Sequence, residues 1–352
     1  TFAYCPQSVL SQGDILEVAI RSMKGAEATL LRGFTTTRDA GGNPFAIKRL
    51  IDSGEFPGPR ILPSGPPIAQ TSGHFDFRDR NATPSSPGDP LDYWRRNLLL
   101  SLADGVPEMI KRSRENLRAG ATQIKLATGG GVSSYYDPLD VSEYTFEEVK
   151  AAVDVADSWN TYVLAHVMTD RAIRMSLEAG VKSIEHGFFA SDETLAMMKK
   201  KEAWIVPQPF LKSDLTFDNP SSQEKFNQVS EAVESLYAKV KSKGVNIGFG
   251  SDLLFDPEAA AMQGALLARL GRWYSPYEVL RIATSENARL LALAGPRNSY
   301  QDGALGVVAE GAYADLLLVD GNPLDDLAAV TDPDNIRIIM KDGELYKNTL
   351  EN

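Results

Sequence analysis

Short apolar segments alternate with amphipathic segments along most of the chain, with the periods expected of strands and helices. The predicted strands are residues 34–38, 60–64, 122–127, 162–167, 183–186, 204–207 and 246–250. The predicted helices are residues 16–31, 44–51, 106–117, 146–156, 171–178, 193–200 and 223–241, and two more begin at Glu258 and Ser275. This alternation indicates an α/β fold with a parallel sheet. A doubly wound sheet and a TIM-like (β/α)8 barrel both fit, and seven visible strands favour the barrel.

The two ends of the chain depart from this pattern. The first predicted helix begins close to Thr1, so the first barrel strand is expected to precede the chain as given. After Gly295, residues 314–320 and 336–340 are predicted strands, and Asp342-Gly343 predicts a hairpin turn. We therefore expect a barrel over residues 1–294 and part of a small β-domain over residues 295–352.

Composition narrows the classes of partner. The chain has 36 Lys and Arg against 47 Asp and Glu, a formal net charge of −11. This balance argues against a nucleic acid or an anionic membrane as the main partner, and no apolar run approaches the roughly 18 residues that span a bilayer. The single Cys5 excludes an intrachain disulfide and a cysteine-rich zinc site. The N-terminus carries no targeting signal, so the compartment stays open.

Four polar residues fall at the ends of predicted strands. They are Lys125, His166, His186 and Asp252. Each alone has an ordinary explanation: a lysine reaching solvent from a strand end, a hydrogen-bonded core histidine, or a carboxylate that caps a turn. Together they lie at the carboxyl ends of successive barrel strands, where barrel enzymes place their catalytic groups.

This set of side chains suits a divalent metal ion, because imidazole and carboxylate are common ligands of such ions. Lys125 can contribute only as a neutral amine or as a carbamate formed with CO2, and a carbamate has two oxygens that can bridge two ions. Only three histidines occur in the chain, and two of them are in this set.

The same positions carry a family resemblance. The sequence resembles the amidohydrolase superfamily, in its imidazolonepropionase-like and Xaa-Pro dipeptidase-like branch, which includes carboxypeptidase-like amidohydrolases and ochratoxin-hydrolysing amidases. The ordered motifs that carry it cover nearly the whole chain: residues 33–39, 71–74, 124–132, 165–166, 185–187, 250–252, 283–288, 311–315 and 322–324.

The resemblance implies a distorted barrel with a small β-sandwich domain and a dinuclear metal site. Lys125 would be carboxylated and bridge two divalent ions, with zinc the expected metal. His166 and His186 would bind one ion, and Asp252 would bind the other and transfer a proton. His74 would lie near the substrate carbonyl, although a loop histidine that caps the turn at Gly73 explains it equally well.

Further implications concern the substrate. Tyr135 and Tyr136 would line the substrate pocket or else cover its rim. The reaction expected is hydrolysis of an amide bond in a dipeptide or N-acyl amino acid, including ochratoxin-like amides. A cyclic-amide hydrolase or a deaminase is the alternative. The family pattern also implies a small-molecule substrate and a homo-oligomer.

One family motif is absent from the given sequence. The His-x-His pair of the first barrel strand occurs nowhere in it, and the equivalent position falls just before Thr1. We expect the pair to precede the chain as given; without it, one metal ion or none would bind. A non-catalytic barrel is therefore the third hypothesis.

Overall fold

A parallel sheet forms the centre of the molecule. The computed structural model describes residues 2–84 and 88–350, and within them seven strands pair in the order β4-β3-β5-β6-β7-β8-β9. Every neighbouring pair is parallel. The strands are β3 (Ile68–Ala69), β4 (Ser101–Leu102), β5 (Ile124–Ala127), β6 (Val163–Thr169), β7 (Ser183–Phe189), β8 (Trp204–Val206) and β9 (Asn246–Ile247).

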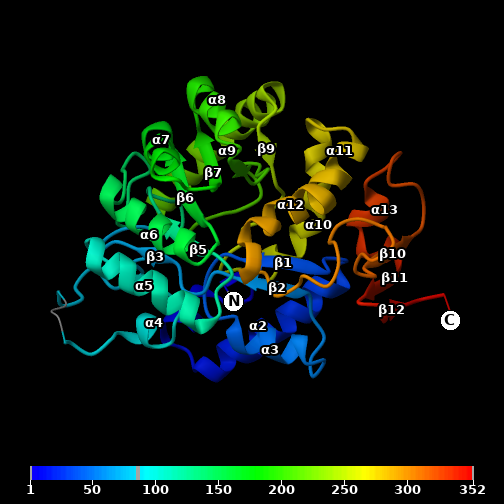
Figure 1. The fold of residues 1–352 in the computed structure, drawn as a ribbon, viewed down its shortest axis with the longest axis horizontal. Coiled ribbons are helices and arrows are strands. Elements are labelled where there is room, and N and C mark those ends of the chain that lie inside the picture. The colour runs from blue at the N-terminus through cyan, green and yellow to red at the C-terminus, as the bar shows by residue number, and fades with distance from the viewer. Residues whose placement is uncertain (1, 85–87, 351–352) are drawn as a thin grey trace.

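A second parallel pair lies below this sheet in Figure 1. It consists of β1 (Thr36–Asp39) and β2 (Arg60–Pro63). The backbone N–H of Thr122 donates to the carbonyl of Pro63 at 2.7 Å, and Gln123 Nε2 donates to the carbonyl of Leu62 at 3.1 Å. These two bonds join the end of β2 to the segment that leads into β5.

Helices follow the strands and cover the outside of the sheet (Figure 1). They are α5 (Val106–Ala119), α6 (Phe146–Ser158), α7 (Asp170–Ala179), α8 (Asp192–Lys200) and α9 (Pro220–Lys243). Thr145 and Glu148 form a capping box at the start of α6, and the Asn219 side chain caps α9. Apolar residues of these helices, such as Val149 and Val233, join strand residues in one large buried cluster.

Further helices precede the large sheet, lie between its strands or follow it along the chain. Those before the large sheet are η1 (Phe2–Tyr4), α1 (Gln7–Gln12), α2 (Ile15–Leu31) and α3 (Phe45–Asp52), and α4 (Tyr93–Arg96) lies between β3 and β4. Those after β9 are η2 (Ala259–Met262), α10 (Gln263–Arg269), η3 (Leu270–Arg272), α11 (Pro276–Arg281), η4 (Ile282–Glu286), α12 (Asn287–Leu291) and η5 (Ala292–Arg297). Among the described residues, none of the helices combines the length and the apolar character needed to cross a membrane.

A small antiparallel sheet lies at the right of Figure 1. It contains β10 (Leu316–Val319), β11 (Ile336–Lys341) and β12 (Glu344–Asn348), with α13 (Ala328–Thr331) and η6 (Pro333–Asn335) between β10 and β11. Leu30 of α2 packs on Ile336 and Ile339, and Arg60 of β2 pairs with Asp315 and Asp342. The boundary predicted at residues 294 and 295 falls inside η5, and it stays a prediction.

The predicted fold class is confirmed, with two differences in detail. All seven predicted strands occur, but β1 and β2 form a pair of their own. The sheet instead includes β3 and β4, which the hydrophobic pattern did not reveal. Each has only two residues, so neither is long enough for an alternating pattern.

Candidate functional site

The candidate residues converge on one cavity of about 790 Å³. Lys125, His166, His186, Asp252 and His74 all lie in its wall. They come from β5, β6, β7 and the segments that follow β9 and β3. Because the strands are parallel, their carboxyl ends meet at one edge, which brings together residues spread over 179 positions of the chain.

Strand register determines which side chains face the cavity. His166 pairs with Ala127 on one side and with Glu185 on the other, so Lys125, His166 and Glu185 share a face of the sheet. His186 follows Glu185 directly and would point to the opposite face in a regular strand. Its φ of 72° interrupts the alternation, and both Glu185 and His186 line the cavity. Such left-handed backbone costs about 1–3 kcal/mol in a non-glycine residue and is concentrated at functional sites.

The rim side chains lie close to one another. The rings of His166 and His186 are 4.5 Å apart between centroids, and His186 Nε2 is 3.7 Å from Asp252 Oδ2. Asp252 also has a left-handed backbone, with a φ of 44°. Its carboxylate is partly open to solvent, whereas His166 and His186 are buried. Asp252 is therefore the member of the set most accessible to water.

Hydrogen bonds fix the free nitrogen of His186. Gln208 Nε2 donates to the carbonyl of Val206 at 3.0 Å, which identifies Gln208 Oε1 as the atom 2.6 Å from His186 Nδ1. His186 Nδ1 must therefore carry the proton and donate it to Gln208. The lone pair lies on Nε2, the nitrogen that faces Asp252. A histidine ligand oriented by a hydrogen bond at its other nitrogen is the usual arrangement in metal sites.

Burial favours the uncharged form of the basic groups of the site. It lowers the pKa of Lys125, of His166 and of His186; the neighbouring rings and Lys125 lower that of His166 further. Glu185 and Asp252 partly oppose this effect at Lys125. Neutral imidazoles have a lone pair for a metal ion, and a neutral amine is the form that reacts with CO2. The donor set thus fits a metal ion, with Lys125 as a carbamate.

A metal site built from the described residues would need Lys125. Within residues 2–84 and 88–350, no three His, Cys, Asp or Glu side chains are grouped so that they could hold a metal ion. His166 also makes a 3.2 Å hydrogen bond from Nε2 to the carbonyl of Gly130, which leaves Nδ1 as its free nitrogen. His166, His186 and Asp252 alone therefore do not make a metal site in this arrangement.

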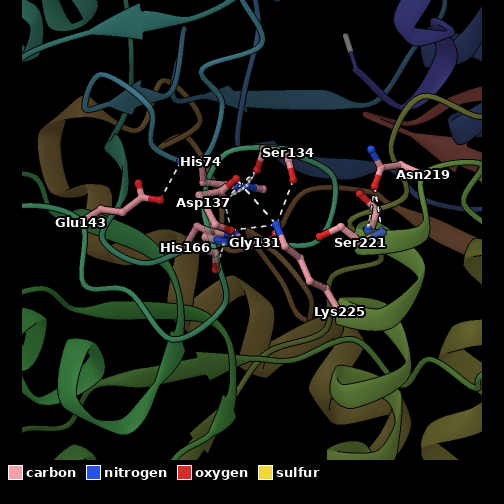
Figure 2. Close-up of polar contacts among 11 residues, drawn as sticks. His74, Gly131, Ser134, Asp137, Glu143, His166, Asn219, Ser221 and Lys225 are labelled. Carbon is pink, nitrogen blue, oxygen red and sulfur yellow. Dashed lines mark hydrogen bonds and ion pairs between the residues drawn. The ribbon is translucent and has the colours of Figure 1, made fainter. Parts of the chain in front are cut away.

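His74 forms the other wall of the cavity (Figure 2). Its ring stacks on His166 with 3.8 Å between centroids and 13° between planes. Its backbone N–H donates to Glu143 Oε1 at 2.7 Å, and Nδ1 lies within hydrogen-bond distance of Ser134 Oγ and Asp137 Oδ2. His74 is thus buried and held from both its backbone and its ring. These contacts of the His74 ring are made with Ser134, Asp137 and His166. None of them caps the turn at Gly73, which was the alternative role for this histidine.

The sequence of the whole chain identifies its family. A sequence model described as the Amidohydrolase family matches residues 8–346. The chain belongs to the amidohydrolase family. It is therefore a hydrolase, and the resemblance inferred from the ordered motifs is confirmed.

Three named proteins are similar to most of this chain. Ochratoxinase from Aspergillus niger is 31% identical over 343 residues, which cover 93% of this chain and 68% of the relative. The crystal structure of a prolidase complexed with N-methylphosphonate-L-proline has a TM-score of 0.88 and 35% identity over 99% of this chain and 84% of the other. A Xaa-Pro dipeptidase with bound methionine in its active site has a TM-score of 0.80 and 28% identity over 95% and 80% of the two chains.

Two of the predicted substrate residues lie away from the cavity wall. Tyr135 is 43% exposed and its hydroxyl donates to Gln7 Oε1 at 3.3 Å. Tyr136 packs edge-on against Tyr135 and lies beneath Arg80. Neither tyrosine is among the described residues that line the cavity. Contact between these tyrosines and the substrate stays a prediction, and it would require a substrate that extends beyond the cavity.

Several polar residues of the site were not singled out by the sequence. Arg38 of β1 donates to Glu185 at 2.7 Å, to Tyr162 Oη at 3.2 Å and to Ser183 Oγ at 3.3 Å. Burial alone would raise the pKa of Glu185, but Arg38 and Lys125 hold it below its usual range. Arg38 and Glu185 could have been found from the sequence, because both are charged residues inside predicted buried strands. No such signal marks Ser134, Asp137 and Glu143, which lie in a loop.

Proposed function

We propose that this amidohydrolase cleaves an amide bond in a dipeptide or an N-acyl amino acid with a metal-activated water. Divalent metal, with zinc the expected ion, would be held by Lys125 as a carbamate, His166, His186 and Asp252. The observation that carries the proposal is the convergence of these residues on one cavity with His74, in an environment that lowers the pKa of Lys125 and of His186.

The bound ions would supply a water of lowered pKa and would polarise the carbonyl group of the substrate. Asp252 takes a proton from the attacking water and delivers it to the nitrogen of the leaving amine, as general base and then general acid. Its partly exposed carboxylate, 3.7 Å from His186 Nε2, suits this transfer. His74 faces the substrate carbonyl and stabilises the charge that develops on its oxygen.

The substrate class is supported by what the relatives' names state. One relative is an ochratoxinase, one is a prolidase complexed with a phosphonate analogue that contains L-proline, and one is a Xaa-Pro dipeptidase with bound methionine. An amino acid as the leaving group is common to these descriptions. We therefore expect a small-molecule amide with a free carboxylate, and ochratoxin-like amides fall within this class. Assembly into a homo-oligomer remains a prediction.

Metal analysis combined with a substrate panel tests the proposal. The purified chain is loaded with Zn²⁺ and its metal content measured. Hydrolysis of N-acetyl amino acids and Xaa-Pro dipeptides is then compared with that of imidazolone-type cyclic amides, before and after chelation. We expect turnover of the first group, lost on chelation and restored by Zn²⁺.

Hydrolysis unaffected by chelation would contradict the proposal. Preference for cyclic amides would favour the alternative reaction, and absence of any turnover by a folded, metal-loaded chain would favour a non-catalytic barrel.

A further inference from the structure

A buried carboxylate lies behind His74, in the loop that follows β5 (Figure 2). Asp137 Oδ2 accepts hydrogen bonds from the Gly131 backbone N–H at 2.7 Å and from Ser134 Oγ at 2.7 Å, and it lies 3.2 Å from His74 Nδ1. The side chain is 1% exposed. The residues that make these contacts all lie outside the barrel strands, so the Asp137 carboxylate does not bond to the sheet.

The charge state of Asp137 decides the direction of the bond to His74. Burial alone would raise the pKa of Asp137, but the hydrogen bonds from His74 and Ser134 and the nearby Lys225 hold it below its usual range. An ionised carboxylate can only accept hydrogen bonds. His74 Nδ1 must therefore carry a proton and share it between Asp137 Oδ2 and Ser134 Oγ.

Lys225 of α9 fixes the loop that carries Asp137. Its ammonium group donates to the carbonyls of Gly131 at 2.9 Å, Ser134 at 2.9 Å and Asp137 at 2.8 Å. An ammonium group has three donors, and all three are used on this one loop. The same group lies 3.8 Å from Asp137 Oδ1 and balances the buried negative charge.

The loop also approaches the two histidine rings too closely for any side chain at Gly131. A Cβ atom there would lie 2.3 Å from His74 Nδ1 and 2.7 Å from His166 Nε2. Glycine thus permits the backbone N–H of residue 131 to reach Asp137 while the loop packs on both rings. The hydrogen bonds to the His74 ring are made at Nδ1. Nε2 is therefore the nitrogen available to a group in the cavity.

We propose that Asp137 is a positioning residue for His74, holding its ring by Nδ1–H so that Nε2 meets the substrate, and that Lys225 anchors the loop that makes this possible. The inference rests on the proposed role of His74 at the substrate carbonyl. A ring held in this way can donate from Nε2 only when both nitrogens carry protons, and its positive charge then lies against the Asp137 carboxylate. An Asp–His pair of this kind fixes tautomer and orientation in other hydrolytic sites.

The wild-type protein allows a first test without any variant. The chain has only three histidines, so a long-range ¹H–¹⁵N spectrum of protein labelled on histidine contains three ring systems. The signals of His74 are those missing from His74→Asn. We expect a protonated Nδ1 on His74. A His74 ring with a bare Nδ1 would overturn the proposal, whether or not the enzyme is active.

Kinetics of the Zn²⁺-loaded full chain provide the second test, with the best N-acetyl amino acid or dipeptide of the panel. Asp137→Asn keeps the size of the side chain and removes its charge. We expect kcat to fall about 100-fold, with KM changed less than about threefold. The same change in a His74→Asn background is expected to have little further effect, because residues that act as a unit are not additive. Equal losses from Asp137→Asn in both backgrounds would overturn the proposal.

Two further variants separate this role from general destabilisation. Asp140→Asn alters an exposed carboxylate three residues away and is expected to leave kcat and the His74 signals unchanged. Ser134→Ala provides the same test if Asp137→Asn does not fold. It removes the other hydrogen-bond partner of His74 Nδ1 and retains the Asp137 carboxylate. We expect it to shift the His74 Nδ1 signal and to lower kcat less than Asp137→Asn does. An unshifted His74 signal in both Asp137→Asn and Ser134→Ala contradicts the proposal. Failure of the wild type to hydrolyse any amide instead contradicts the proposed function and leaves the NMR test standing.

Discussion

The two walls of the cavity are built by different means. Lys125, His166 and His186 belong to strands, and the sheet ladder with its parallel register places them. His74 lies on a loop, and its hydrogen bonds to the side chains of Ser134, Asp137 and Glu143 hold it. In the strand wall, the backbone positions the chemistry; in the loop wall, buried side chains do so. Substitutions should therefore affect chemistry alone in the first wall, and chemistry together with local order in the second.

The largest expected effect is that of Lys125→Ala in the strand wall. Loss of Lys125 from the cavity lining removes the proposed carbamate, and we expect activity to fall by about 10³-fold or more while the fold persists. Short carboxylic acids such as acetate or propionate should restore part of the activity, because they supply the missing carboxylate. Lys212→Ala, at an exposed position, is the matched control. Wild-type activity in Lys125→Ala would exclude the carbamate.

The next effect tests the buried ion pair beneath the strand wall. Arg38→Met leaves Glu185 as a buried charge without its 2.7 Å partner, and removal of one partner of such a pair costs about 3–5 kcal/mol. Chemical denaturation measures the free energy of unfolding. The double variant Arg38→Met/Glu185→Gln is expected to recover part of this loss because it removes the uncompensated charge. Additive losses in the double variant would show that the two side chains stabilise the barrel independently.

The same comparison explains what the sequence could predict. Strand periodicity predicted the barrel, and the rule that parallel strands end at one edge selected Lys125, His166, His186 and Asp252 from their positions alone. His186 was found although its side chain reaches the cavity only through a left-handed backbone, which no spacing reveals.

In the loop wall, His74 was named from the family resemblance, but the residues that hold it were beyond such reasoning. The contacts of Asp137 and Lys225 join residues 63 and 88 positions apart through side chains and carbonyls, without any periodic pattern. Tyr135 and Tyr136 show the limit of sequence proximity, since their position next to the glycine run left open a place in the pocket lining or over its rim, and they are not among the residues that line the cavity. In a loop, sequence proximity to a site does not determine the direction of a side chain.

Gly131→Ala perturbs the loop wall directly. The added methyl group would lie 2.3 Å from the His74 ring, so the loop or the ring must shift. We expect a loss of stability of about 1–3 kcal/mol and a lower kcat. Gly271→Ala is the matched control, because the nearest atom to its added Cβ, on Leu327, is at an ordinary 3.4 Å. A kcat and unfolding midpoint equal to those of the wild type would mean that the loop is not packed against His74.

The smallest effect is expected from Glu143→Gln, and it appears only as a function of pH. Burial, together with the charge of Asp137, raises the pKa of Glu143 to about 9. The folded state therefore binds a proton that the unfolded state releases near its ordinary pKa of 4.5. The sign follows: the stability linked to this proton is complete below about pH 4.5 and is lost progressively as the pH rises towards 9. Glutamine is uncharged, and its side-chain oxygen can still accept from the His74 N–H.

This difference defines the measurement. The unfolding free energies of the wild type and Glu143→Gln are compared from pH 5 to pH 9. The unfolding free energy of the variant should rise relative to that of the wild type as the pH increases through this range. Glu147→Gln alters an exposed carboxylate on the first turn of α6 and should show no such trend. Parallel curves for wild type and Glu143→Gln would mean that Glu143 is ionised in the folded protein. The backbone of His74 would then be held by a buried charge, and the loop wall would depend on Lys225 to balance two carboxylates instead of one.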